Sequence, residues 1–503
     1  MALNATLSQH SQSSTGRQNR ASSLTRPIFY LLGILLCAEA VAMLVPAAVA
    51  WIAGDSDWRA FVASGAITGF SGGSLYLTCR GRPIVIRVKQ AFLLTTAAWL
   101  TLGAFGALPF LLHVPGLTVA DAFFEATSGL TTTGSTILLQ LEEMTAGVLV
   151  WRALLQWSGG IGIIMLAVAV LPYLGVAGMQ LFRTDASERS ERVLPRPGQT
   201  ATAIVAVYVT ATVACATSYW LAGMTAFDAA LHAMTTVSTG GYATSDASLG
   251  QFARREVEWV AIFFMILGAV PFVLLIRAIR GQTGSLFRED QVRMLVFGIA
   301  LSGLGAAVWL NVNEGIPLAD ALRLTLFHIT SIVTTTGFVT SDYQFWGNAA
   351  VVAFFFLTLV GGCTGSTAGG IKMLRFRIVY VALRMQFHRL IFPHGMFPPT
   401  YRQRVVSDEI ISSVLAFLFL YLLTLVAATI ALSLLGLDFV TSISAAATTL
   451  SNVGPGLGPI IGPGGNFAPL PDAAKWILSA LMLLGRLELF TALVLLSPRF
   501  WRS

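Results

Sequence analysis

Long runs of apolar residues alternate with short polar segments along most of the chain. Runs near the roughly 20-residue length of a bilayer crossing predict transmembrane helices, because a helix satisfies its backbone hydrogen bonds internally. The pattern therefore predicts an all-α polytopic membrane protein with about ten crossings. The predicted spans are residues 28–52, 60–78, 88–112, 147–176, 200–222, 256–279, 291–311, 348–376, 409–436 and 475–498.

Four of the segments between these spans contain a second, shorter pattern. Each has a moderately apolar stretch of roughly a dozen residues, too short to cross a bilayer, followed by small residues around a glycine. This pattern predicts a short helix that enters the membrane and returns. The clusters recur about every hundred residues and form an internal repeat. They are Thr131-Thr132-Thr133-Gly134-Ser135, Ser238-Thr239-Gly240-Gly241-Tyr242, Thr334-Thr335-Thr336-Gly337-Phe338 and Ser451-Asn452-Val453-Gly454-Pro455.

The second cluster contains two adjacent glycines, and its flanking residues decide which one matches the other clusters. Aligning Gly241 with Gly337 also aligns His232 with His328, so Gly241 is the equivalent glycine. The two histidines are candidates either for proton relays or for neutral side chains bonded to nearby backbone. Glu125 occupies the corresponding place in the first repeat, which favours a polar contact that holds each short helix.

The composition indicates a protein surrounded mainly by lipid. Of the 503 residues, 55% are hydrophobic and 11% are charged, whereas an ordinary soluble domain has about 25% charged residues. The four cysteines are too scattered for a metal-ligand spacing or a dense disulfide framework. Redox chemistry and metal binding by thiols are therefore not expected. No grouping of His, Asp, Glu or Ser suggests an enzyme.

The positive charges are gathered in alternate loops. The formal net charge of +7 could suggest nucleic-acid binding, but the basic loops alternate with segments nearly free of Lys and Arg. By the positive-inside rule, the basic loops and both termini are predicted to face the cytoplasm. The segments with the glycine clusters, at about 113–146, 223–255, 312–347 and 437–474, are then predicted to face outward, with Arg254 and Arg255 as exceptions to the pattern.

The glycine clusters suit the binding of a cation. A cation that loses its water shell needs replacement oxygen atoms, and backbone carbonyl groups supply them without burying a formal negative charge. Glycine permits backbone angles that a side chain forbids, and the C-terminal ends of the short helices add negative potential. Four such clusters on one side of the membrane predict a carbonyl-lined pore for monovalent cations.

Three longer motifs resemble those of a known family. They are Gln156-Trp157-Ser158-Gly159-Gly160-Ile161-Gly162, Gly361-Gly362-Cys363-Thr364-Gly365-Ser366-Thr367-Ala368-Gly369-Gly370 and Asn452-Val453-Gly454-Pro455-Gly456. Over about residues 90–500 the chain is similar to the Trk/Ktr/HKT superfamily of potassium transporters, and within it to the TrkH type. The resemblance implies four pseudo-repeats of helix, pore helix with filter loop, and helix around a central pore, preceded by two further transmembrane helices.

The resemblance also implies an assembly and a division of the chain. It implies potassium uptake across the cell inner membrane, a homodimer, and a cytosolic TrkA-type regulatory ring that carries the nucleotide, with no organic cofactor on this chain. The predicted parts are a cytoplasmic tail (1–26), two amino-terminal transmembrane helices (27–79) and pore repeats at 80–198, 199–289, 290–404 and 405–503.

Potassium is expected to bind the backbone carbonyls of the filter. The filter residues are Thr132, Thr133, Gly134, Thr239, Gly240, Gly241, Thr335, Thr336, Gly337, Asn452, Val453 and Gly454. The alternative function is a proton- or sodium-coupled carrier of potassium or sodium, a class that places carboxylates at a midplane site.

The glycine-rich run at 361–370 interrupts a predicted span. It is not a phosphate-binding loop, because no Gly-Lys-Ser or Gly-Lys-Thr ends it. Two interpretations remain, a tight patch of helix packing or a flexible gate below the filter, and the family resemblance favours the gate. The gate residues are then Gly361, Gly362, Gly365, Gly369 and Gly370.

Arg486 lies near the middle of the last predicted span. An ionisable group at that depth is costly and usually marks an ion path or a buried pair. One interpretation makes Arg486 part of the gate, where it repels cations on the cytoplasmic half of the pore. The other pairs Arg486 with Glu488 or with helix carbonyls.

Overall fold

The computed structural model describes residues 25–81, 87–169, 197–402 and 404–502. Most of the predicted tail at 1–26 lies outside the described residues. So do the end of the span predicted at 147–176 and the predicted basic loop after it.

Helices make up nearly all the regular structure of the described residues. A small antiparallel hairpin is formed by β1 (Thr400–Tyr401) and β2 (Arg404–Val405), with Thr400 opposite Val405. The predicted all-α polytopic fold class is therefore confirmed.

The number of uninterrupted spans is smaller than predicted. Within the described residues, six helices are long and apolar enough to cross a membrane, or eight if each of two sharply bent pairs is one span. The sequence predicted about ten. One of the remaining two is α3 (Trp58–Cys79), which contains several glycine, serine and threonine residues. The other is divided by the glycine-rich run into α17 (Asn348–Leu359) and α18 (Met373–Ile391).

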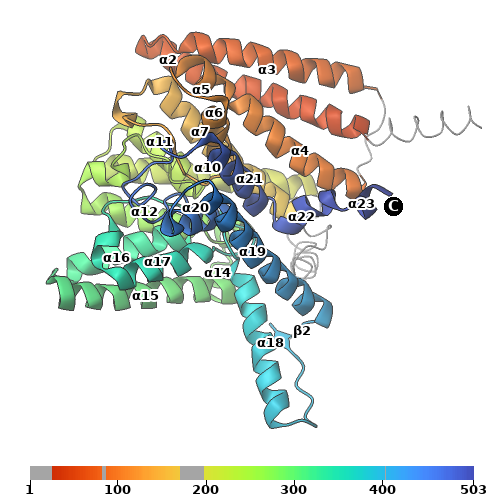
Figure 1. Cartoon of the computed structure of the whole chain (residues 1–503), viewed down its shortest axis with the longest axis vertical. Helices are drawn as coiled ribbons and strands as arrows, with labels where there is room; N and C mark the ends of the chain where they lie inside the picture. The colour runs from red at the N-terminus through yellow and green to blue at the C-terminus, as the bar shows by residue number, and fades with distance from the viewer. Residues whose placement is uncertain (1–24, 82–86, 170–196, 403, 503) are drawn as a thin grey trace, which may run out of the picture.

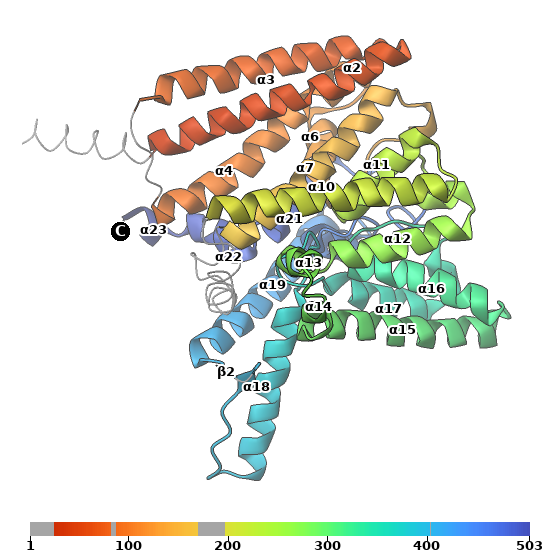
Figure 2. The same ribbon diagram turned by 180° about the vertical axis from the view of Figure 1, so that it is seen from behind.

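Two helices precede the repeated units and lie along one edge of the molecule (Figures 1 and 2). The first, Thr25–Ala53, ends with α2 (Leu44–Ala53), and α3 runs back beside it. Two carboxylates join their turn to the start of α7 (Ala146–Ala169). Asp57 accepts a hydrogen bond of 2.6 Å from the Thr145 hydroxyl, and Asp55 accepts one of 3.1 Å from the Ala146 N–H. Asp55 thereby satisfies a donor that the helix leaves unpaired.

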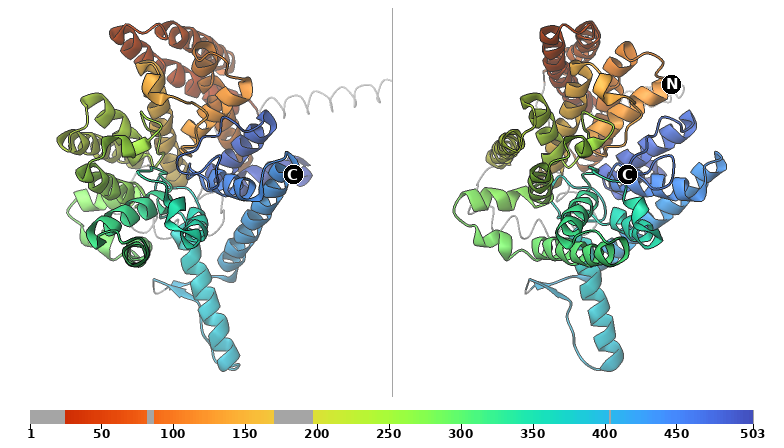
Figure 3. Two further views of the ribbon diagram at one scale, coloured as in Figure 1. Left: turned by 60° about the vertical axis from the view of Figure 1, so that its left-hand side comes forward. Right: turned by 90° about the vertical axis from the view of Figure 1, so that its left-hand side faces the viewer.

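Four units of similar build follow, and they surround a common centre (Figure 3). Each has a long first helix, a short buried helix, a loop and a second helix. The first unit consists of α4 (Val88–Gly106), α5 (Leu108–His113), α6 (Val119–Leu130), η1 (Leu141–Glu143) and α7. The second consists of α10 (Pro197–Leu221), α11 (Ala226–Val237), η2 (Ser248–Phe252), α12 (Arg255–Gly268), α13 (Phe272–Ile279) and α14 (Gly284–Phe287).

The third and fourth units repeat this order. The third consists of α15 (Asp290–Glu314), α16 (Leu318–Val333), η3 (Tyr343–Trp346), α17 and α18, and α18 projects away from the body together with the hairpin (Figure 1). The fourth consists of α19 (Asp408–Leu434), α20 (Phe439–Ser451), α21 (Asp472–Arg486), α22 (Leu489–Leu493), η4 (Val494–Leu496) and α23 (Pro498–Arg502).

Three of the four short helices, α6, α11 and α20, begin with side-chain caps. Thr118 caps α6 and Thr225 caps α11, and each threonine oxygen accepts an N–H bond of 3.1 Å from the aspartate three residues on. Asp438 caps α20 by accepting the Thr441 N–H at 3.0 Å. These caps fix where the three helices start, and therefore where their C-terminal ends meet the centre.

Two second helices that the sequence predicted as continuous spans are sharply bent. The prediction of continuous helices at 256–279 and 475–498 was wrong, because α12 and α13 meet at 103° and α21 and α22 meet at 111°. Pro271 explains the first bend, since it has no N–H to continue the helix, and the next N–H, that of Phe272, donates to Gly365 at 3.1 Å. At the second bend Glu488 has a φ of 62°, outside the helical region.

The buried contact between Asp57 and Thr145 yields a stability prediction. Asp57 is fully buried, so Asp57→Ala leaves the Thr145 hydroxyl without its acceptor. We expect the free energy of unfolding to fall by about 1–3 kcal/mol. Thermal unfolding of the detergent-purified protein measures the change, with Glu314→Ala at the exposed end of α15 as the control. Equal melting temperatures for both variants would show that apolar packing alone holds the two amino-terminal helices.

Candidate functional site

The four glycine clusters share one backbone conformation. In each, the glycine has a positive φ, and so does the residue two positions before it. The left-handed region costs a residue other than glycine roughly 1–2 kcal/mol, so the surrounding structure must impose it. The φ values are 51° and 86° at Thr132 and Gly134, 52° and 78° at Thr239 and Gly241, 57° and 82° at Thr335 and Gly337, and 57° and 117° at Asn452 and Gly454.

These glycines meet in a closed ring, which we call the glycine ring. A Cβ atom at Gly134 would lie 2.2 Å from the carbonyl oxygen of Gly240, the residue before Gly241. The same relation joins every unit to the next. The distances are 1.8 Å from Gly241 to the Thr336 oxygen, 2.0 Å from Gly337 to the Val453 oxygen and 2.9 Å from Gly454 to the Thr133 oxygen. The structure therefore brings the predicted filter residues together, and it leaves no room for a side chain at the four glycines.

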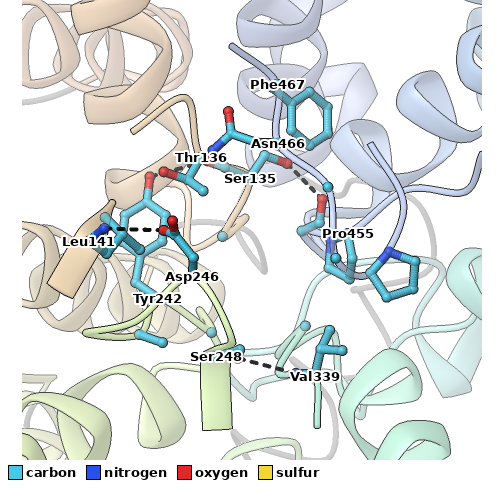
Figure 4. A pocket seen from close by; sticks show the side chains of 18 of the residues that line it. Ser135, Thr136, Leu141, Tyr242, Asp246, Ser248, Val339, Pro455, Asn466 and Phe467 are labelled. Carbon is cyan, nitrogen blue, oxygen red and sulfur yellow. Dashed lines mark hydrogen bonds between the residues drawn. The ribbon is translucent and has the colours of Figure 1, made fainter. Parts of the chain in front are cut away.

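A cavity of about 140 Å³ lies on one side of the ring, the side of the residues that follow the four glycines in sequence. All four ring glycines line it, with Ser135, Tyr242, Asp246 and Pro455 around them (Figure 4). The residues before the glycines are buried beneath: Thr132, Thr133, Thr239, Thr335, Thr336, Asn452 and Val453 are at most 1% exposed. The ring is thus the floor of a cavity whose wall is formed by loops of all four units.

Acidic side chains hold the loops at the mouth of this cavity. The Asp246 carboxylate accepts the N–H groups of Gln140 at 2.8 Å and Leu141 at 3.2 Å, which joins the second unit to the first. Glu142 accepts hydrogen bonds from the Ser245 hydroxyl and the Asp246 N–H. The bond from Ser245 holds the pKa of the Glu142 carboxyl below its usual value. Negative charge is therefore kept at the mouth, where it attracts cations.

A buried ion pair supports the ring beside the cavity. Arg152 and Glu125 are 2.9 Å apart and at most 2% exposed, and Glu125 also accepts the Ile137 N–H at 3.0 Å. The Arg152 guanidinium donates to the Ala243 carbonyl at 2.9 Å and lies over the Tyr242 ring, 4.0 Å from its centre. The sequence indicated the polar role of Glu125 but missed Arg152. The available signal was an arginine inside an apolar span, as at Arg486.

Two amide side chains fix the backbone of the ring. Gln156 donates to the Gly240 carbonyl at 2.7 Å and accepts the Tyr242 N–H at 3.0 Å. Asn452 donates to the Thr133 hydroxyl and to the Met482 carbonyl, both at 2.9 Å. Each amide bridges two segments, so it sets the distance between neighbouring units.

The glycine-rich run passes on the other side of the ring from the cavity. The Gly370 N–H donates to the Ser451 carbonyl at 2.8 Å, at the end of α20, and the Gly369 N–H donates to the Thr335 hydroxyl at 2.6 Å. The run is therefore bound directly to the chain that leads into the ring. The predicted gate glycines Gly361, Gly362, Gly365, Gly369 and Gly370 all lie in it, and we call residues 361–370 the crossing loop.

The crossing loop also contacts the second unit. The Thr367 hydroxyl donates to the Val237 carbonyl at 3.2 Å and to the Gly268 carbonyl at 2.9 Å. These carbonyls end α11 and α12, which have no internal partner for them. The loop therefore supplies hydrogen-bond donors to the carbonyls that end helices of the second and fourth units.

Arg486 is bonded to this loop. Its Nη1 donates to the Thr367 carbonyl at 2.8 Å, and the side chain is 3% exposed. Its Nε and Nη2 have no hydrogen-bond partner among the described residues. The predicted alternative of a pair with Glu488 is not formed, because Glu488 forms its salt bridge with Arg375.

The two histidines of the short helices have structural contacts. His328 Nε2 accepts the N–H groups of Thr340 and Ser341, both at 3.3 Å. His232 Nδ1 is bonded to the Asp228 carbonyl at 2.8 Å. Of the two alternatives, backbone-bonded side chains fit these contacts. The described residues contain no group of three or more His, Cys, Asp or Glu that could hold a metal ion.

The fold and the ring define a class of membrane protein in which four helical units, each with a short re-entrant helix, meet at a common centre. A family model described as "TrkH: Cation transport protein" matches residues 58–300 and 308–503. The chain belongs to this family.

Curated relatives and a solved structure agree with this assignment. The Trk system potassium uptake protein TrkI of Halomonas elongata is 45% identical over 478 residues, which are 95% of this chain and 97% of that protein. The Trk system potassium uptake protein TrkH of Vibrio parahaemolyticus is 36% identical over 485 residues, 95% of this chain and 99% of that one. The crystal structure of the potassium transporter TrkH from Vibrio parahaemolyticus matches with a TM-score of 0.88 at 35% identity, covering 95% of this chain and 99% of that chain.

The contribution of the buried Arg152–Glu125 pair to stability can be tested with single and double variants. Arg152→Met leaves the Glu125 carboxylate buried without its cation, so the free energy of unfolding should fall by about 3–5 kcal/mol. Arg152→Met combined with Glu125→Gln should lose less, because no unpaired charge remains. Denaturant unfolding of the purified protein measures both. A double variant as unstable as Arg152→Met would contradict the assigned role of the charge pair.

Proposed function

We propose that this chain carries potassium ions into the cell through a filter of backbone carbonyl groups at the glycine ring. The observation that carries the proposal is the geometry of the ring. Each ring glycine faces a carbonyl oxygen of the neighbouring unit, and this oxygen belongs to the residue directly before that unit's own ring glycine. Oxygens gathered from four sides can replace the water shell of a cation. The relatives at 45% and 36% identity are named as potassium uptake proteins, which supports potassium as the ion.

The filter carbonyls are proposed to belong to the residues predicted from the sequence. These are Thr132, Thr133, Gly134, Thr239, Gly240, Gly241, Thr335, Thr336, Gly337, Asn452, Val453 and Gly454. The short helices α6, α11, α16 and α20 end where the filter segments begin, so the negative ends of their dipoles favour a cation there. No organic cofactor is proposed on this chain.

The filter is not fourfold identical, and we expect its selectivity to be correspondingly less strict. Asn452 and Val453 stand where the other units have Thr or Gly. Side chains also hold individual filter carbonyls: Gln156 donates to Gly240 at 2.7 Å and Ser135 donates to Gly454 at 2.9 Å. A carbonyl that already accepts a bond from the protein has less freedom to follow an ion, so the four sides should contribute unequally.

The crossing loop and Arg486 are proposed to form the gate. The loop lies on the ring's far side from the cavity and is bonded to Thr335 and Ser451, so it lies across the route of an ion leaving the filter. Arg486 adds a positive charge to this obstruction. Opening of the gate then requires the loop to break its hydrogen bonds to several units at once. The position of the loop is therefore suited to the control of ion flow.

The assembly and orientation follow the same proposal. We place the protein in the cell inner membrane with both termini in the cytoplasm, as a homodimer controlled by a cytosolic nucleotide-binding ring of the TrkA type. The proposed parts keep the boundaries predicted from the sequence, with a tail, two amino-terminal helices and four pore repeats. The relatives' designation as members of a Trk system supports a multisubunit assembly.

Potassium uptake into proteoliposomes tests the proposal. With the membrane potential fixed, uptake should follow the potassium gradient and remain when the proton and sodium gradients are each abolished. Uptake that disappears with either gradient would indicate the coupled carrier instead. Absence of potassium uptake by protein that retains its fold would contradict the proposal altogether.

The glycine ring predicts a loss of selectivity on substitution. A side chain at Gly337 would meet the Val453 oxygen, and its φ of 82° is unfavourable for any other residue. We expect Gly337→Ser to reduce potassium uptake or lower the potassium-to-sodium ratio by about tenfold, which is about 1.4 kcal/mol. Gly305→Ser in α15 is the control, because a Cβ there meets nothing within 4 Å. If Gly134→Ser, Gly241→Ser, Gly337→Ser and Gly454→Ser all leave uptake and selectivity unchanged, the filter assignment fails.

The gate predicts increased flux when Arg486 is removed. Arg486→Ala deletes the charge and its bond to the Thr367 carbonyl, and a charged hydrogen bond is worth about 1.5–3 kcal/mol, so the basal flux should rise about tenfold. The control is Arg293→Ala, whose side chain is 62% exposed. Potassium flux into proteoliposomes without any partner protein measures the effect. A folded Arg486→Ala protein with equal or lower flux would favour a purely structural role.

A further inference from the structure

We propose that a cavity beside the first unit binds an amphipathic amine, a molecule with one ammonium group and one long apolar chain. The cavity has a volume of about 570 Å³ and lies between the helix Thr25–Ala53, α4 and α7. Its wall is largely apolar and includes Trp99, Trp151 and Trp157. These helices are among those long and apolar enough to cross a membrane, so the cavity lies between spans and suits a mainly apolar molecule.

Glu39 gives this apolar cavity its single acidic group. It lies near the middle of the helix Thr25–Ala53 and lines the cavity, yet it is only 9% exposed. Its Oε2 atom has no hydrogen-bond partner among the described residues, and no described cation forms a salt bridge with it. A carboxylate is costly at this depth unless a cation lies beside it. The ammonium group of a bound amine supplies that cation.

Four other polar side chains of the wall already have partners. Trp151, Trp157, Ser158 and Thr95 donate to oxygen atoms of the protein at distances from 2.8 to 3.1 Å. Among the described lining residues, Glu39 therefore presents a buried acceptor oxygen that still needs a partner. The cavity therefore fits a molecule with one polar head and an otherwise apolar body, and the carboxyl group of Glu39 favours an ammonium head over an anionic one.

The position of the cavity gives its occupant contact with the support of the glycine ring. Leu130, which lines the cavity, is the last residue of α6 and directly precedes the first filter segment. Leu130 also packs in one cluster with Trp99, Leu166 and Leu487, and Leu487 lies at the bend after α21, next to Arg486. An occupant of the cavity therefore contacts Leu130, Trp99 and Leu166, and their cluster reaches from the end of α6 to the bend after α21. The binding proposal itself does not depend on the proposed function.

Cross-linking to the full-length protein in lipid nanodiscs tests this proposal. The probe is dodecylamine carrying a photoactivatable diazirine on its chain, and the comparison probe is the matching dodecanol. We expect the amine to label residues of the helix Thr25–Ala53, α4 or α7, and to be displaced by unlabelled dodecylamine. Because the alcohol has no charge to pair with Glu39, its affinity should be about tenfold lower.

Two variants and a control identify the site. Glu39→Gln keeps the shape but removes the charge, and should weaken amine binding by about tenfold. Gly162→Leu should weaken labelling strongly, because a Cβ at Gly162 lies 3.7 Å from Trp99 and a larger side chain occupies part of the cavity beside it. Glu314→Gln, at an exposed position, should change nothing.

Several results would overturn the proposal. Equal affinities for amine and alcohol, unaffected by Glu39→Gln, would mean that the cavity accepts only the chain of a membrane lipid. Labelling that is lost on protein dimerisation would mean that a second copy of the chain covers the cavity. If Glu39→Gln does not fold, wild-type selectivity for amine over alcohol and the effect of Gly162→Leu still decide the matter.

Discussion

The close approach of four glycines to four carbonyl oxygens is the constraint on which the rest of the structure depends. A Cβ placed on any of these glycines would lie 1.8 to 2.9 Å from an oxygen of the neighbouring unit, so no residue with a side chain can close the ring. The four units must then end their short helices at the same level and with the same backbone turn. This requirement explains why Thr132, Thr239, Thr335 and Asn452 all accept a positive φ that they would not adopt alone.

A ring of this kind buries many polar groups, and their partners account for much of the surrounding sequence. Gln156, Asn452 and the pair Glu125–Arg152 bond backbone atoms that would otherwise be unsatisfied, and each unsatisfied group would cost about 1–3 kcal/mol. The crossing loop has the same role on the other side, where the Thr367 hydroxyl bonds the carbonyls that end α11 and α12. A loop without its own helix is suited to this task, since its backbone groups are free to bond elsewhere.

The sequence allowed the spans, the four clusters and the equivalent glycines to be predicted, because periodic hydropathy and a steric need for glycine leave direct traces in residue type. It did not reveal the bends in the second and fourth units, since a bent pair of helices is as apolar as a straight span. Pro271 was the available signal for one bend, and Glu488 gave none by its residue type. The sequence also could not pair Arg152 with Glu125 or Arg375 with Glu488, because such partners are 27 and 113 residues apart and only the fold brings them together.

In the proposed ion path, a cation lies beside carbonyl oxygens on both sides of the ring, but the cations differ. On one side, the four ring glycines line a cavity whose wall includes hydroxyl side chains and the Asp246 carboxylate, and we propose that a cation enters the ring from this cavity. On the other side, the protein's own cations occupy the oxygens of the crossing loop, with Arg486 on the Thr367 carbonyl and Lys372 on the Ala368 carbonyl. A mobile cation would have to displace a side chain that is covalently attached and carries the same charge. In the proposed path, that competition makes the side of the crossing loop the more resistant half, and it gives the buried Arg486 and the half-buried Lys372 a physical reason to lie there.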